Sequence, residues 1–275
     1  MKLRNRKRLW LITLLVILSL AMYLTNELLR AAHYRTSFIS GWFLLGMVVF
    51  LAVFGIRKKF SFLPSRIFPI GTAATWLQFH IYIGLLTAII FLLHIGFSVP
   101  NGSIEIVLAV FYVGTFLSGV AGLTLSRFIP RRLTARGEEV LFERIPIFRK
   151  KIHEEVRDLC GINSTGSALS ALIDLYENHL QHFLDGPRNV LWHLIFSSRP
   201  RYQLVKHLNG CRQFLSEEEL PKVDQIANLI HKKDDLDYHY ALQGILKIWL
   251  FVHIPLTYGL LIFAAFHAIL VHSFT

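Results

Sequence analysis

The chain has 275 residues, of which 53% are hydrophobic and 17% charged, and its formal net charge is +11 at pH 7. Soluble domains carry about 25% charged residues, so this composition excludes an ordinary soluble enzyme, as well as a disordered or disulfide-stapled chain. Residues 127–247 carry 18 Lys/Arg and 16 Asp/Glu, whereas the rest of the chain carries 11 Lys/Arg and only two acids, Glu27 and Glu105. Basic residues beside apolar runs are typical of membrane edges and not of nucleic-acid binding. We therefore expect a membrane protein that binds no nucleic acid.

Five apolar segments are long enough to cross a hydrocarbon core as helices, which takes about 20 residues. In chain order they cover residues 9–29, 38–56, 75–97, 104–125 and 247–271. The sequence thus predicts an all-α integral membrane bundle of five transmembrane helices. Four of them belong to residues 1–126, and residues 247–275 supply the fifth.

The Lys and Arg residues of the short loops predict how this bundle is oriented. The N-terminal tail has five of them, the loop at 57–74 has four, and Arg30 and Arg35 are the two on the opposite side. Because basic loops stay in the cytoplasm, we expect a cytoplasmic N-terminus and a periplasmic C-terminus in a bacterial inner membrane. The first segment also resembles a cleavable signal peptide, but its apolar run continues through Leu24, which favours a retained helix.

Residues 127–246, between the fourth and fifth segments, have the composition of a cytoplasmic insert. Apolar residues at helical spacing predict five helices there, at 138–157, 167–184, 190–196, 203–214 and 217–230. Cys160 and Cys211 lie in this insert, on the reducing side, and are expected to be free thiols. Glu177, His179 and His182 have a spacing that a metal site permits, but a solvated helix face explains them better.

Four histidines lie inside the predicted spans, where ionisable residues are expensive and mark functional sites. His80 and His94 are 14 residues apart in the third segment, and His253 and His267 are 14 residues apart in the fifth. Fourteen residues make nearly four helical turns, so each pair lies near one face with about 21 Å between its members. His80 and His253 lie at similar depths in the membrane, and so do His94 and His267. We therefore expect His80 opposite His253 and His94 opposite His267. Two facing imidazoles can ligate both axial positions of a haem iron.

Small residues accompany these histidines and leave room for a flat macrocycle. Between the ligands they are Gly84 and Thr87 in the third segment and Thr257 and Ala264 in the fifth. Further glycines lie in the second and fourth segments, namely Gly41, Gly46, Gly114, Gly119 and Gly122. Ordinary helix packing in membranes explains small residues equally well, so they do not by themselves indicate a cofactor.

The H-x13-H pattern on two helices of one bundle resembles that of membrane di-haem cytochromes b. Its placement on the third and fifth helices is similar to the transmembrane domain of ferric reductases and NADPH oxidases. The resemblance covers the five spans and not the insert. It implies two non-covalent b haems, an inner one held by His80 and His253 and an outer one held by His94 and His267.

The chain also departs from that family. Ferric reductases carry a flavin- and NAD(P)H-binding domain after the last helix, which we do not expect in this protein, and the insert has no Gly-rich dinucleotide loop. The sequence has no C-x-x-C-H motif for c-type haem and no cysteine cluster for an iron–sulfur centre. We therefore expect an electron-transfer subunit of an oxidoreductase complex rather than a complete enzyme. Its expected partners are cytoplasmic or periplasmic redox proteins, and a quinone is a further candidate.

Two other classes of protein remain open. A transporter or channel that uses the intramembrane histidines for metal or proton passage would favour closer histidine spacing and additional acids in the spans. A purely structural membrane anchor would need none of the four histidines. 

Several residues near the predicted membrane edges are candidate partners for haem propionates. On the outer side they are His33, Arg35 and His272, and on the inner side Arg66 and Lys247. Anchoring at the membrane edge explains these residues equally well.

Overall fold

The computed structural model describes residues 13–14, 16–25, 27–28, 36–56, 73–136, 140–162, 170–195, 197–215, 217 and 220–274. Throughout these residues the regular structure is helical, with no strand among them, which confirms the all-α prediction. The chain divides into two compact units, one made of residues 1–123 and 250–275 and the other of residues 124–249. We call them the apolar unit and the inserted unit.

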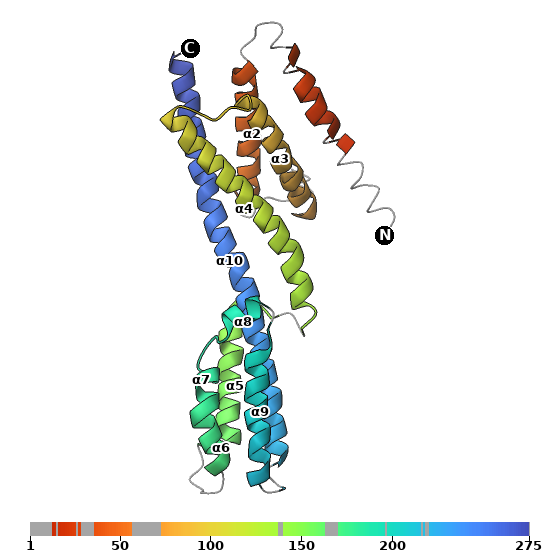
Figure 1. Cartoon of the computed structure of the whole chain (residues 1–275), viewed down its shortest axis with the longest axis vertical. Coiled ribbons are helices and arrows are strands. Elements are labelled where there is room, and N and C mark those ends of the chain that lie inside the picture. Colours follow the sequence, from red (N-terminus) through yellow and green to blue (C-terminus); the bar gives the residue numbers. More distant parts are fainter. Residues whose placement is uncertain are drawn as a thin grey trace, which may run out of the picture. The chain divides into compact units, whose positions relative to one another are not determined.

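Four long helices are labelled α2, α3, α4 and α10 in Figure 1. They run over Thr36–Ile56, Ala73–His94, Ser103–Leu133 and Leu220–Phe274. Of the described residues, α3, α4 and α10 contain stretches long and apolar enough to cross a membrane. Shorter apolar helices occupy Ser37–Val53 and Val16–Thr25, at the predicted second and first spans. Three of the five predicted spans are thus found as membrane-length helices, and parts of residues 9–29 lie outside the described residues.

Helix α3 ends at His94, three residues before the end predicted from hydropathy. Gly96 has a φ of 63°, and the amide of Phe97 donates to the carbonyl of Leu92 at 3.1 Å. A glycine in the left-handed region just after a helix satisfies the last carbonyls and stops the helix. Hydropathy does not report this backbone change, because Ile95 and Phe97 are themselves apolar.

Helix α4 continues to Leu133, beyond the predicted end of the fourth segment at residue 125, and includes Pro130. A proline inside a helix removes one hydrogen bond and costs about 3 kcal/mol. Ile129 and Leu133 are buried in a cluster with Tyr238 and Leu242 of α10. This burial, at about 25 cal/mol per Å² of apolar surface, stabilises the helix beyond the proline.

One apolar cluster in the apolar unit joins α2, α3, α4 and α10. Val48 of α2, Tyr112 of α4 and Leu260 of α10 are buried in it, and Phe91 of α3 packs against them. The rings of Phe91 and Tyr112 are stacked, with centroids 4.0 Å apart. Stacked aromatic rings and shape-matched contacts hold helices together in an apolar solvent, where burial alone provides little drive. The candidate histidines of α3 and α10 are therefore carried by helices that share one core.

The inserted unit is built from short helices and the first part of α10. In chain order they are η2 (Phe142–Arg144), α5 (Ile145–Leu159), α6 (Ser170–Leu175), η3 (Tyr176–Leu180), α7 (Gln181–Leu184), α8 (Val190–Leu194), α9 (Arg199–Gly210) and η4 (Cys211–Phe214). Helix α9 begins four residues before its predicted start, because Pro200 fits the first turn of a helix. Helix α10 joins two predicted helices, at 217–230 and 247–271, into one.

Apolar residues of these helices share one core in the inserted unit. Ile145, Ile152 and Val156 of α5 are buried at the spacing of one helix face, together with residues of α6, α7, α9 and α10. Both cysteines are free, and burial raises the pKa of the Cys160 thiol to about 12. Cys160 is therefore an unreactive core residue in the folded state.

A lysine lies at the centre of the inserted unit with no exposed surface. The ammonium of Lys233 donates to the carbonyl of Phe183, to the carbonyl of Gly186 at 2.8 Å and to Asp237 Oδ2 at 2.5 Å. Arg149 lies 3.7 Å from the other oxygen of Asp237. All three ammonium protons are thus used, and they tie α10 to the turn that follows α7. A buried ion pair is tolerated only when its remaining hydrogen-bonding capacity is satisfied in this way.

Asp234, one residue further along α10, is almost completely buried beside three donors. His193 Nε2 lies 3.5 Å from Oδ1, while Arg201 and Arg136 lie 3.4 Å and 3.8 Å from Oδ2. Desolvation, together with the positive charges of Arg136, Lys233 and Arg201, lowers the pKa of His193 to about 4. His193 is therefore neutral at neutral pH, and the two arginines supply the positive charge that faces Asp234.

Replacing Lys233 with methionine should destabilise the inserted unit, because Asp237 would be left buried without its main counter-charge. Removing one partner of a buried ion pair costs about 3–5 kcal/mol. The measurement is the thermal midpoint at which a thiol-reactive dye labels Cys160, in the full-length protein with Cys211 changed to serine. Lys150→Met is the matched control, because Lys150 forms an exposed i,i+4 pair with Glu154 and such pairs contribute about 0.3–0.5 kcal/mol. Equal midpoints for the two variants would contradict the role given to Lys233.

The protonation of His193 should make stability depend on pH. Its native pKa of about 4 lies below the value of about 6.5 expected in the unfolded chain. The unfolded state therefore binds more protons between these values, so the contribution of His193 is present above about pH 6.5 and is lost as the pH falls toward 4. The loss should be on the order of 1–3 kcal/mol.

The measurement for His193 is the difference in unfolding midpoint between the wild type and His193→Gln, followed by circular dichroism across this pH range. Burial raises the pKa of Asp234, which gives a pH dependence of opposite sign, so the difference between the two proteins is needed to isolate His193. A difference that does not change with pH would show that His193 is not held neutral in the folded protein.

Candidate functional site

The predicted outer pair, His94 and His267, comes together in the apolar unit. The centroids of the two rings are 6.5 Å apart and the ring planes are inclined by 89°. His94 is the last residue of α3, and His267 lies in α10. Both rings are partly buried.

The His94 ring is oriented by the first turn of α2. Nδ1 lies 2.9 Å from the carbonyl oxygen of Ser37 and 3.3 Å from the hydroxyl of Ser40. A carbonyl can only accept a hydrogen bond, so Nδ1 carries the proton and Nε2 keeps its lone pair. This is the arrangement in which a histidine ligates a metal through one nitrogen while the other donates to a backbone carbonyl.

Gly41 allows the His94 ring to approach the α2 backbone closely. A Cβ atom at this position would lie 2.9 Å from Cε1 of His94, which is closer than real side chains come. Gly46 and Gly84 have nothing within 4 Å of such an atom. Of these three glycines, Gly41 is therefore the one whose small size the histidine requires.

A cavity of about 490 Å³ surrounds the outer pair. It is lined by His94, His267, Gly41 and the predicted small residue Ala264, and most of its other lining residues are apolar. Further polar side chains also line it, namely Ser37, Ser98, Asn101, Glu105, Tyr112 and His272. A largely apolar cavity with a few converging polar groups is the usual form of a cofactor or small-molecule site.

The predicted inner pair, His80 and His253, lies further along the same two helices. His253 Nδ1 is 3.2 Å from the hydroxyl of Ser118 on α4, and Gly119 lies beside the same ring. His80 lies close to the backbone of Leu51 on α2 and within electrostatic range of His253. His80 precedes His94 in α3, and its partner His253 precedes His267 in α10. Residues 250–274 of α10 therefore run in the same direction as α3.

The two predicted threonines have their hydroxyls occupied by other groups of the protein. Thr87 Oγ1 donates to the carbonyl of Gly84 at 2.7 Å and accepts a hydrogen bond from the hydroxyl of Tyr112 at 3.1 Å. Thr257 Oγ1 donates to the carbonyl of His253 at 2.9 Å. Thr87 is buried and is not among the residues that line the cavity around the outer pair. Its physical role in the structure is to join α3 to α4.

The candidate propionate partners have different surroundings. His272 stacks on Phe38, with ring centroids 5.6 Å apart, and lines the outer cavity. The ammonium of Lys247 lies 2.8 Å from Glu143, so it is engaged by an acid of the inserted unit. His33, Arg35 and Arg66 lie outside the described residues.

His179 and His182 do not converge on a common point. His179 stacks in parallel on His207 at 4.6 Å, whereas Nδ1 of His182 accepts a hydrogen bond from Arg188 at 3.2 Å. Among the described residues, no group of three or more His, Cys, Asp or Glu side chains is placed to hold a metal ion. A haem iron differs in needing only two protein ligands, because its macrocycle supplies the others.

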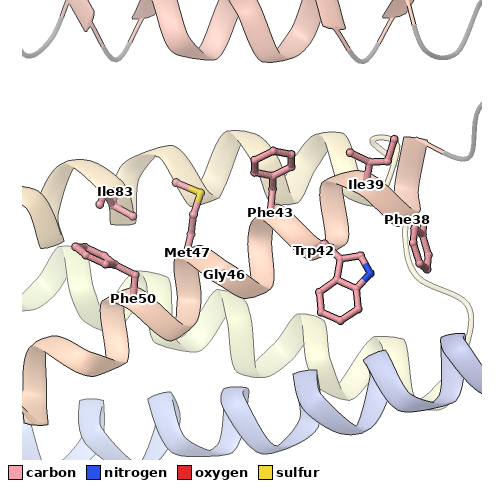
Figure 2. Close-up of a pocket in the computed structure, with 8 residues that line it drawn as sticks. All are labelled: Phe38, Ile39, Trp42, Phe43, Gly46, Met47, Phe50 and Ile83. Carbon is pink, nitrogen blue, oxygen red and sulfur yellow. The ribbon is translucent and has the colours of Figure 1, made fainter.

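A second cavity, also of about 490 Å³, lies along α2 and is almost entirely apolar. Figure 2 shows its lining residues, which are Phe38, Ile39, Trp42, Phe43, Gly46, Met47, Phe50 and Ile83. It offers few polar groups to orient a ligand, so the cavity around His94 and His267 is the better candidate for a cofactor site.

Sequence reasoning missed the residues that orient the histidines. Ser37, Ser40 and Ser118 come from helices other than those of the histidines they contact. Single serines in apolar segments are common and give no periodic signal. Only the depth of each serine in its span could have suggested a partner.

No protein-family model, no curated protein and no solved structure matches this chain. The resemblance to di-haem cytochromes b therefore depends on the histidine pattern.

Gly41→Ala should disturb the outer pair, because the new Cβ would force the His94 ring away from the carbonyl of Ser37. Overpacking costs about 1–3 kcal/mol, and the loss of a hydrogen bond costs about 0.5–1.5 kcal/mol more. The thermal midpoint of the purified protein should fall for Gly41→Ala and stay constant or rise for Gly46→Ala on the same helix. If both variants keep the wild-type midpoint, the close contact between Gly41 and His94 does not exist in solution.

Proposed function

We propose that this protein is a di-haem b-type cytochrome, the transmembrane electron-transfer subunit of an oxidoreductase complex. The observation that carries the proposal is the outer pair, in which the rings of His94 and His267 lie 6.5 Å apart in a cavity lined by Gly41 and Ala264. In this proposal His80 and His253 hold a second haem at the depth of the inner pair.

The separation of the outer rings fits two axial ligands of one iron. Bonds from imidazole nitrogen to a metal are about 2.0–2.1 Å long. Two imidazoles on opposite sides of one ion therefore place their ring centroids about 6–6.5 Å apart. The centroids of His94 and His267 are 6.5 Å apart, and the hydrogen bond from Nδ1 of His94 to Ser37 leaves Nε2 for the iron.

A haem bound in this way supplies one-electron transfer between ferrous and ferric iron. Each haem would be held by two histidines, His94 and His267 or His80 and His253, and would therefore supply electron transfer rather than a place for oxygen or another substrate to bind. Members of a histidine pair 14 residues apart lie about 21 Å apart along a helix. The two sites would therefore divide the crossing of a hydrocarbon core about 30 Å thick into shorter electron-transfer steps.

Residues of the chain would tune the two sites differently. Ser37 and Ser118 would fix the ring orientation of His94 and His253, respectively. Glu105 lines the outer cavity and acts electrostatically on His94. A carboxylate beside a haem stabilises the ferric state, so Glu105 would lower the reduction potential of the outer site relative to a neutral residue.

Partners and location follow from the same proposal. The three membrane-length helices support a membrane-embedded protein, and the basic loops favour a bacterial inner membrane with the inserted unit in the cytoplasm. The inserted unit would then receive a cytoplasmic redox protein, while a periplasmic carrier or a quinone would exchange electrons with the other site.

Histidine variants test both the cofactor and the pairing. With haem bound, His94→Ala and His267→Ala should remove or alter the same centre, because each empties one axial position of one iron. His80→Ala and His253→Ala should alter the other centre. The measurement is a redox titration of the haem absorption spectrum for each variant.

His179→Ala is the matched control, because it removes a histidine from the inserted unit without touching either pair. It should leave two haems per chain and both reduction potentials unchanged. A wild-type protein without haem would contradict the cytochrome proposal. A shared defect of His80→Ala and His267→Ala would contradict the pairing.

A further inference from the structure

Helix α8 in the inserted unit exposes large apolar side chains on one side. Leu191 is 76% exposed, Ile195 66% and Trp192 42%, whereas His193 between them is buried. Leu194 is partly buried and packs against the cluster that contains Ile129. Helix α8 is therefore fixed on one side and leaves a compact apolar surface on the other.

The contacts of Leu194 show at which end of the inserted unit α8 lies. The same cluster includes Leu125 of α4, and Ile245 and Leu246 of α10. These residues lie where the apolar, membrane-length stretches of α4 and α10 give way to charged sequence. Figure 1 shows α8 at the end of the inserted unit opposite α6. Helix α8 therefore lies at the level where the two helices would leave the bilayer.

A second exposed apolar group lies at the same level. Leu141, just before η2, is 60% exposed, and Ile147 in the first turn of α5 is 68% exposed. Gln243 of α10 donates to the carbonyl of Val140 at 2.8 Å, and the ammonium of Lys247 contacts Glu143. These contacts hold η2 beside residues 243–247, at the base of the predicted membrane segment of α10.

Exposed arginines accompany both groups. Arg144 follows Leu141, Arg199 follows Ile195, and Arg127 and Arg131 lie at the end of α4. Arginine beside exposed leucine, isoleucine and tryptophan is typical of segments that lie in the membrane interface, where the apolar side chains enter the acyl boundary and the arginines contact lipid phosphates. A docking site for an acidic protein would not need the apolar side chains to gather at the level of the membrane.

We propose that Leu141, Ile147, Leu191, Trp192 and Ile195 form an interfacial rim that inserts into the lipid headgroup region. The inserted unit would then rest directly on the membrane that α4 and α10 cross, with anionic phospholipids as its ligand. Helices α4 and α10 already connect the inserted unit to the membrane. The two apolar groups of the rim would attach it at two further points and would restrict its tilting. The proposal does not depend on haem binding.

The test measures membrane depth with nitroxide labels on the full-length protein in nanodiscs of phosphatidylcholine and phosphatidylglycerol. Single cysteines replace Leu191 or Ile195 in a background that carries Cys160→Ala and Cys211→Ser. Collisions with oxygen, which concentrates in lipid, are compared with collisions with a water-soluble nickel chelate. The rim positions should show a several-fold higher ratio of oxygen to nickel collisions than the control position.

Phe214→Cys is the matched control. Phe214 is also apolar and is 72% exposed, but it follows α9, whose 12 residues carry it about 18 Å from the start of that helix near α8. Each labelled protein must retain the wild-type circular dichroism. Nickel accessibility at Leu191 and Ile195 equal to that at Phe214 would overturn the proposal, because the rim would then lie in water. Low collision rates with both reagents would also overturn it, because a protein would then cover the rim.

Arg199→Glu provides an independent readout. The charge reversal should shift the label at Ile195 toward water in nanodiscs that contain phosphatidylglycerol, because the new carboxylate is repelled by anionic headgroups. An unchanged depth in this variant would contradict the assignment of anionic phospholipid as the ligand.

Discussion

An imidazole inside a membrane needs a partner for each ring nitrogen, because hydrocarbon offers neither donors nor acceptors. This constraint accounts for the arrangement of the apolar unit. His94 gives its Nδ1 proton to the carbonyl of Ser37, and His253 directs Nδ1 toward Ser118. In both cases the contact comes from a neighbouring helix, so the requirement of the histidine also fixes how the helices pack. In the proposal, the remaining nitrogens are satisfied by iron.

The same constraint takes another form in the inserted unit, where charged groups are buried. Lys233 uses all three of its protons on two carbonyls and Asp237, while Arg136 and Arg201 face Asp234. Lys233, Asp234 and Asp237 lie on α10, the helix that also carries His253 and His267. Some of the acidic and basic residues that occur in nearly equal numbers in residues 127–247 are therefore buried. The high charge content of this region does not mean that all of its charged side chains lie on the surface.

The sequence predicted the helices and the histidines to different degrees. Long apolar runs and the 14-residue spacing of His80 and His94 are local signals, and the structure shows a helix at this run. The structure also brings His94 to His267. The continuity of α10 was not predicted, because the helix predicted at 217–230 and the span predicted at 247–271 left the charged residues 231–239 unassigned. Their partners, such as Phe183 and Arg201, are distant in sequence. Gly41 and Ser37 gain their importance only from contact with His94, which no pattern within α2 reveals.

Whether the two histidine pairs hold haem is decided by the haem content and optical spectrum of the purified wild-type protein, oxidised and then reduced with dithionite. We expect non-covalent b-type haem at two per chain, six-coordinate and low-spin in both redox states, as two pairs of histidine ligands require. A colourless protein, or one whose haem is five-coordinate in the wild type, would show that the histidine pairs do not hold haem in this way.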